Sequence, residues 1–210
     1  MSVRLFCGIF AVLVLLAGAL SAADKSTSTV DAAGMKQLYS EDFSSSPSTD
    51  WQTAKGTWKN VDGALQGSEE ASDKHAAVAR HEFKFNDAVL ELDFKLDGAK
   101  MVSLSINDAK NHLCRVQIYP DRFRVMKDDH DGPKGPDKGE VLAEKTLEFK
   151  PGTWHHIRVE FKGPMMTAKI DDTSAGGEHA QIALPKANLG LVVGGQTASF
   201  RNLRLSVPAN

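Results

Sequence analysis

Two carboxylates with strand spacing, Glu91 and Asp93, are the first residues whose types and separation could do chemistry. Residues two apart in an extended chain project from the same face, with Cα atoms about 7 Å apart. Such a pair can act as nucleophile and acid/base in the cleavage of a glycosidic bond. The next residue on that face is Lys95 rather than a third carboxylate. The alternative is therefore a solvated stripe of charges.

A second group of polar side chains flanks the dipeptide Pro120-Asp121. Guanidinium and amide groups donate hydrogen bonds to sugar hydroxyls or to a carboxylate, and a tyrosine ring offers a stacking surface. We predict that these residues contact a ligand: Arg115, Gln117, Tyr119, Arg122 and Arg124. The alternative is that they pair only with one another across a hairpin.

The segment 127–139, KDDHDGPKGPDKG, is rich in Asp, Gly and Pro. Asp129 and Asp131 are candidate calcium ligands, because a hard cation prefers clustered oxygens. The pattern of a hand-type calcium loop fails, since its first and twelfth places would be Lys127 and Lys138. We therefore expect a hairpin loop and no cofactor, with calcium as the alternative.

The histidines and cysteines do not have the spacing of a metal site. His155 and His156 are adjacent on an expected strand, so they point to opposite faces, and His155 shares the apolar one. Cys114 alternates with Val116 and Ile118, which predicts a buried, unreactive thiol.

The N-terminal residues are typical of an export signal. Arg4 is the only charge before Asp24, and small residues stand at Ser21 and Ala23. We predict three parts, namely a cleaved signal peptide at 1–23, a flexible tether at 24–37 and a β-sandwich at 38–207. The alternative is an uncleaved membrane anchor. Cleavage leaves a secreted or periplasmic protein that does not contact the membrane and has one cysteine, hence no internal disulfide.

Composition excludes several classes of protein. The 210 residues carry 25 Lys and Arg against 27 Asp and Glu, a net charge of −2. A chain without positive charge overall is not a typical nucleic-acid binder, and 41% apolar residues exclude a disordered chain.

Within the domain, apolar residues recur at every second position of several segments. Residues 88–96 alternate apolar and charged, and a turn at Asp97-Gly98 is expected before the next strand. The segment 112–127 predicts a hairpin that sets Ile118 beside Phe123 and Gln117 beside Arg124. Further strands are predicted at 101–106, 154–161, 165–170, 187–193 and 198–207. Many short strands without a long amphipathic helix predict an all-β sandwich or barrel.

Three segments carry a resemblance to known domains, namely LYSEDF…DW…GTWKNVDGALQG, GTWHHIRVEFKG and ANLGLVVGG…SFRNLRLS. Across 38–207 the chain resembles concanavalin A-like jelly rolls. Within them it is similar to 3-keto-disaccharide hydrolase-like domains and to laminin-G-like modules. The resemblance implies a two-sheet antiparallel jelly-roll β-sandwich that binds saccharides on its concave sheet or rim loops. Gln117 matches the Gln of a Glu-x-Gln motif of the hydrolase-like domains, and Arg115 replaces its Glu.

The resemblance and the residues together predict an exported carbohydrate-active domain that binds a small glycan. Hydrolysis of glycosidic bonds is left open, with Glu91 and Asp93 as the only catalytic candidates. The alternative is a non-catalytic laminin-G-like module that binds a polysaccharide or a cell-surface partner.

Overall fold

The alternating sequences pair as an antiparallel β-sandwich, which confirms the predicted fold class. The computed structural model describes residues 34–45 and 50–209. The predicted signal peptide and most of the predicted tether lie outside the described residues. Thirteen strands are described: β1 (Met35–Glu41), β2 (Gln52–Lys55), β3 (Thr57–Val61), β4 (Ala64–Ser68), β5 (Ala77–Phe85), β6 (Ala88–Asn107), β7 (His112–Tyr119), β8 (Arg122–Lys127), β9 (Glu140–Thr146), β10 (Trp154–Lys162), β11 (Met165–Ile170), β12 (Thr173–Glu178) and β13 (Lys186–Pro208). Two 3-10 turns complete the described elements, η1 (Ala71–Asp73) and η2 (Ala180–Ala183).

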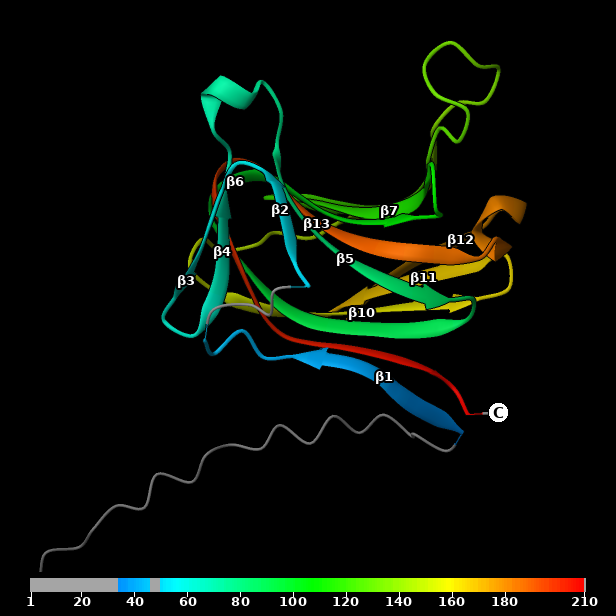
Figure 1. The fold of residues 1–210 in the computed structure, drawn as a ribbon, viewed down its shortest axis with the longest axis horizontal. Coiled ribbons are helices and arrows are strands. Elements are labelled where there is room, and N and C mark those ends of the chain that lie inside the picture. The colour runs from blue at the N-terminus through cyan, green and yellow to red at the C-terminus, as the bar shows by residue number, and fades with distance from the viewer. Residues whose placement is uncertain (1–33, 46–49, 210) are drawn as a thin grey trace, which may run out of the picture. The chain divides into compact units, whose positions relative to one another are not determined.

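The strands form two layers that share the long strands β6 and β13 (Figure 1). One layer, here the β7 sheet, runs β9-β8-β7-β6-β13-β5-β2 and uses the second half of β6 and the first half of β13. The other layer, here the β10 sheet, runs β12-β11-β10-β6-β13 and continues to β1, β4 and β3.

Both long strands bend where they pass from one layer to the other. Gly98 lies at φ +87° and Gly195 at φ +91°, a conformation that favours glycine. The register between β6 and β13 is irregular at this point. The turn expected at Asp97-Gly98 is therefore a bend, and the separate strands predicted at 88–96 and 101–106 are one strand.

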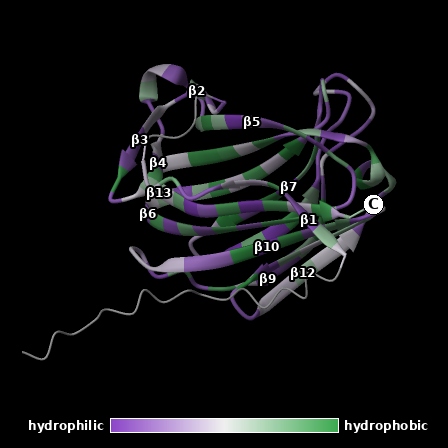
Figure 2. Cartoon of the chain, turned by 60° about the horizontal axis from the view of Figure 1, so that its bottom comes forward, coloured by the Kyte–Doolittle hydropathy of each residue, from purple (hydrophilic) through white to green (hydrophobic). Residues whose placement is uncertain are grey.

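Apolar side chains form the core between the layers. Figure 2 shows apolar residues interspersed with hydrophilic ones along the strands. On β6 the alternation holds in both halves, because Leu92, Phe94, Val102 and Leu104 are all at most 2% exposed. Cys114 is buried as predicted, and burial raises the pKa of its thiol to about 12.

The hairpin of β7 and β8 has the predicted register, with Ile118 opposite Phe123 and Gln117 opposite Arg124. The first strand begins at Met35, three residues before the predicted start of the sandwich. It pairs there with the end of β13, so that the two ends of the described chain lie side by side. No helix among the described residues is long and apolar enough to cross a membrane.

Candidate functional site

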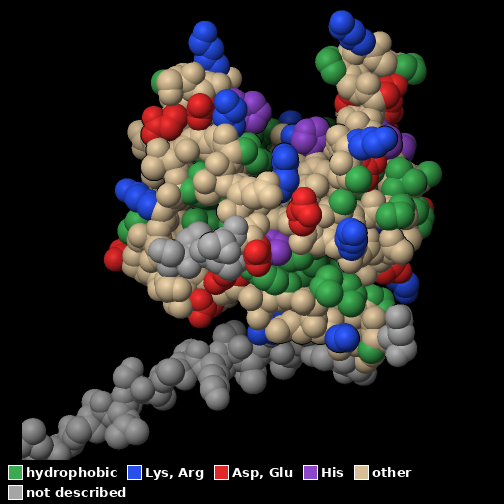
Figure 3. Space-filling view, viewed as in Figure 1, with side chains coloured by type: hydrophobic (Ala, Val, Ile, Leu, Met, Phe, Trp, Pro, Cys, Tyr) green, Lys and Arg blue, Asp and Glu red, His purple; other side chains and the backbone are tan. Residues whose placement is uncertain are grey.

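The outer face of the β7 sheet is hollowed between two projecting loops (Figures 1 and 3). One loop carries η1 and joins β4 to β5, and the other joins β8 to β9. The floor of this hollow includes short side chains, because Ser103 and Ser105 alternate with the core residues of β6, and Ser105 lies beside Gly190 on β13. Small residues on the outer face of a curved sheet leave room for a ligand.

The five predicted ligand contacts all lie on this outer face, since their strand neighbours Val116, Ile118 and Phe123 are buried in the core. They divide into two groups. The Tyr119 ring lies 4.3 Å from the Arg122 guanidinium and 5.5 Å from that of Arg124. Both arginines also pair with Glu144 on β9. These three residues are largely engaged with neighbours, as the alternative of cross-strand pairing expects.

Arg115 and Gln117 lie closer to the floor of the hollow, opposite Ser105 and Ser103 respectively. Arg115 Nε donates to Asp128 Oδ1 at 2.5 Å. Asp128 is 4% exposed, and its burial raises the pKa of its carboxyl despite the neighbouring guanidinium. Gln117 Oε1 accepts a hydrogen bond from the Tyr119 hydroxyl at 3.1 Å, which leaves its amide hydrogens available.

A hydrogen-bonded cluster at one end of the hollow was not predicted from the sequence. Asn107 Nδ2 donates to Asn188 Oδ1 at 2.6 Å, and the hydroxyl of Ser105 donates to Asn107 Oδ1 at 3.3 Å. His112 Nδ1 donates to the same amide oxygen. Burial, and then the charge of Arg115, lowers the pKa of His112, so its imidazole is neutral near pH 7 with a free lone pair on Nε2.

A pocket of about 720 Å³ adjoins this end of the hollow. Its wall includes Ala187, which directly precedes Asn188 in the chain, and Asp108, which directly follows Asn107. Other lining residues include Phe85, Leu184 and Pro185, and His130 Nε2 lies 2.8 Å from Asp108 Oδ2 at the rim. The pocket is apolar with a polar rim, a combination common in small-molecule sites.

The candidate catalytic pair lies elsewhere, on the outer face of the β10 sheet, away from the hollow. His156 on β10 stands opposite Asp93, and Arg158 stands opposite Glu91. Glu91 is only 7% exposed, so the expectation of a solvated stripe was wrong for this residue. The reason is that β10 supplies long cationic side chains that cover the carboxylates.

Charge pairing dominates this cluster. His156 Nδ1 lies 2.9 Å from Asp93 Oδ1, and its Nε2 lies 3.7 Å from Glu91 Oε1. These two carboxylates raise the pKa of His156 to about 9. The hydrogen bond from His156 in turn lowers the pKa of Glu91. Both carboxylates are therefore held ionised by cations, which suits structural pairing and not proton donation to a leaving group.

His155, predicted as a core histidine, is 12% exposed at its side chain and packs against Phe149 at a centroid distance of 5.0 Å. Its Nδ1 contacts Asp171 Oδ2 at 2.7 Å, while its buried Nε2 has no partner among the described residues.

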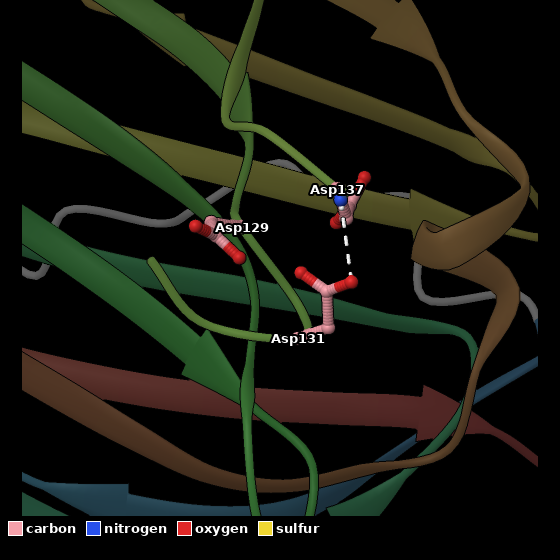
Figure 4. Close-up of side chains that lie close together, drawn as sticks. All are labelled: Asp129, Asp131 and Asp137. Carbon is pink, nitrogen blue, oxygen red and sulfur yellow. Dashed lines mark hydrogen bonds between the residues drawn. The ribbon is translucent and has the colours of Figure 1, made fainter. Parts of the chain in front are cut away.

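The candidate calcium ligands Asp129 and Asp131 do lie together, and Asp137 joins them (Figure 4). Carboxylate oxygens of the three residues are within 4.8 Å of one another. Each also accepts a hydrogen bond from a backbone N–H of the same loop, and Asp137 pairs with Lys127. These donors already stabilise the loop, and calcium binding stays the untested alternative to the expected absence of a cofactor.

Comparison with known proteins supports the architecture. Among solved structures, porphyranase B from Zobellia galactanivorans has a TM-score of 0.65 at 12% identity, covering 84% of this chain and 94% of that one. The carbohydrate-binding module CBM66 from Bacillus subtilis has a TM-score of 0.60 at 20% identity, covering 74% of this chain and 94% of that one. Bacillus licheniformis beta-glucanase has a TM-score of 0.58 at 10% identity, covering 80% and 96%. At such low sequence identities, the TM-scores show a shared jelly-roll fold.

No curated protein matches the sequence. A family model does match, over residues 40–206, which is most of the chain and nearly all of the sandwich. This agrees with the resemblance seen in the opening, central and closing segments. The chain belongs to the family of 3-keto-alpha-glucoside-1,2-lyase-like domains.

Proposed function

We propose that this protein is exported and binds a small saccharide in the hollow of the β7 sheet. The observation that carries the proposal is the polar floor of the hollow in a chain of this family. A saccharide presents hydroxyl groups that both donate and accept hydrogen bonds. The side chains of Arg115 and Gln117 supply hydrogen-bond donors in the hollow, and the Asn188 amide has both a donor and an acceptor group. The adjoining apolar pocket has room for a second part of the ligand.

The family supports this function over the laminin-G-like alternative. Its description names a glucoside, which is a small sugar derivative. The hollow and its pocket together form a concave site, as small-molecule sites do. A module that docks on a large polymer or a cell surface needs no such pocket.

A second candidate function is the elimination that the family description names, a 1,2-lyase reaction on a 3-keto-alpha-glucoside. In such a reaction a base takes the proton from C2, which the C3 carbonyl acidifies. The electron pair then forms the C1=C2 bond, the C1–O bond breaks, and the departing oxygen takes a proton from water. His112 has the features of a base, because it is neutral, is oriented by Asn107 and has Nε2 free.

Binding is tested with a glycan array on the purified protein, followed by calorimetry of the best ligand with two matched variants. Gln117→Ala should weaken binding by about 1–3 kcal/mol, as expected for a lost hydrogen bond to a desolvated ligand. Gln37→Ala, an exposed glutamine on β1, is the control and should bind as the wild type does. Unchanged binding by Gln117→Ala would place the site elsewhere.

Elimination is tested on a 3-keto glucoside and on the same glucoside without the keto group. The product of the first is a conjugated enone, whose ultraviolet absorbance should rise with time. The second should stay unchanged. Loss of the absorbance change in His112→Gln, together with retained binding, supports the role of His112 as the base. Full activity in that variant would exclude this role.

A further inference from the structure

Arg80 on β5 has no acidic partner among the described residues, although it is half-buried. The structure describes seven arginines, and five of them pair with a carboxylate: Arg115, Arg122, Arg124, Arg158 and Arg201. Of the other two, Arg204 is exposed on the β10 sheet, where water solvates it. The Nε of Arg80 is buried and lacks a hydrogen-bond partner within the described part of the chain. A buried guanidinium N–H without an acceptor is unfavourable and calls for an explanation.

The strand register places Arg80 across the hollow from Arg115. Arg80 pairs with Gly190, Gly190 with Ser105, and Ser105 with Arg115. Three strand spacings separate the two arginines, or about 14 Å between Cα atoms. Gly190 and Ser105 have short side chains, so they form a trough between the two longer ones.

The trough is positively charged. After burial, the charges of Arg115 and Arg80 lower the pKa of His112, whereas the charge of Asp128 opposes them. The carboxylate that faces them, Asp128, is buried and already paired with Arg115. Within residues 34–45 and 50–209, Arg80 forms no ion pair, although Glu82 lies two residues away on the same face of β5.

A second polar group without a hydrogen-bond partner among the described residues lies beneath these side chains. The hydroxyl of Ser103, next to Gln117 in the register, is fully buried and has no hydrogen-bond partner among the described residues. The Ser103 hydroxyl is closed off from the hollow, so a ligand cannot contact it, whereas the half-buried Arg80 side chain still offers its Nη–H groups to a bound molecule.

We propose that the hollow selects an acidic saccharide, whose carboxylate is bound by Arg80. The inference rests on the proposed saccharide site and specifies its ligand. The two Nη–H groups at the end of a guanidinium form a planar fork that matches both oxygens of a carboxylate. A neutral sugar offers Arg80 only hydroxyl groups and leaves its charge uncompensated. The carboxylate of a uronic acid supplies both the acceptors and the charge.

The test compares three disaccharides of the same linkage by titration calorimetry. One ends in glucuronic acid, one in glucose and one in 6-sulfated glucose. Wild-type protein should bind the glucuronic acid compound about tenfold more tightly than the glucose compound, as expected for one charged hydrogen-bond pair. It should also prefer the carboxylate to the sulfate.

Two variants test whether Arg80 causes the preference for the glucuronic acid disaccharide. Arg80→Gln keeps a side chain of similar length without the charge, and it should bind the acidic and neutral disaccharides equally, within about twofold. Arg204→Gln removes an exposed arginine from the β10 sheet and should keep the tenfold preference. An unchanged circular dichroism spectrum and urea midpoint show that Arg80→Gln is folded.

The outcomes separate the two proposals. Equal binding of acidic and neutral disaccharides by the wild type, a preference for the sulfate, or a preference retained in Arg80→Gln would overturn the proposed carboxylate ligand of Arg80 while the saccharide site stands. Failure of all three compounds and of the whole glycan array to bind would overturn both.

Discussion

Replacing His156 by Gln tests the charge cluster on the β10 sheet. In the folded protein the imidazole lies between Asp93 and Glu91, and its hydrogen bonds to these carboxylates, together with their charges, raise its pKa to about 9 from an ordinary 6.5. A group whose pKa is higher in the folded state binds its proton more tightly there, so its protonation stabilises the fold. This contribution is complete below pH 6.5 and is lost as the pH rises through about 9.

The size of the effect follows from the pKa and the exposure of the side chain. A rise from 6.5 to about 9 corresponds to about 3.4 kcal/mol at 1.36 kcal/mol for each pH unit. The His156 side chain is 50% exposed, however, so solvent screens the pairs. Exposed ion pairs are typically worth at most about 1 kcal/mol. We therefore expect His156→Gln to lower the free energy of unfolding by about 1 kcal/mol at pH 6.

Urea denaturation at pH 6, 7.5 and 9.5 measures this difference. The deficit of the variant should be largest at pH 6 and should vanish by pH 9.5, where the wild-type imidazole is neutral too. His75→Gln is the control, because His75 Nδ1 contacts the backbone carbonyl of Ala76 instead of a carboxylate. A deficit that is constant across this range, or that grows with pH, would refute the assignment.

Four further predictions concern the core, the thiol, the loop and the N-terminus. Phe123→Ala, in the core, should cost about 3–5 kcal/mol of unfolding free energy, whereas Gln117→Ala on the opposite face of the hairpin should cost about 0.5 kcal/mol or less, both by urea denaturation. Cys114 should resist a thiol reagent in the native state and react on unfolding, and rapid native labelling would contradict its burial. Millimolar calcium should leave the melting temperature unchanged, because the loop carboxylates already have donors; a rise that a chelator reverses would show a calcium site. Mass spectrometry of protein exported by the producing cell should find a chain that begins near Asp24, and an intact Met1 would contradict signal cleavage.

The sequence by itself determined the features that depend on neighbours in the chain. Alternation of apolar and polar residues assigned the strands and the burial of Cys114, because side chains on a strand point alternately to opposite faces. A tight turn also fixes the register of its two strands, which is why Gln117 was correctly placed opposite Arg124. Alternation and register together are sufficient to put the five predicted ligand contacts on one face of the hairpin.

Only the tertiary structure decided which strands lie side by side. Asn107 and Asn188 are 81 residues apart in the chain and bond to each other in the hollow. Asp93 and His156 are 63 residues apart and form an ion pair on the opposite layer. Local periodicity says which face a residue occupies and nothing about the partner strand. The same is true of Arg80, which forms no ion pair with the described residues and which four neighbouring strands place across a trough from Arg115.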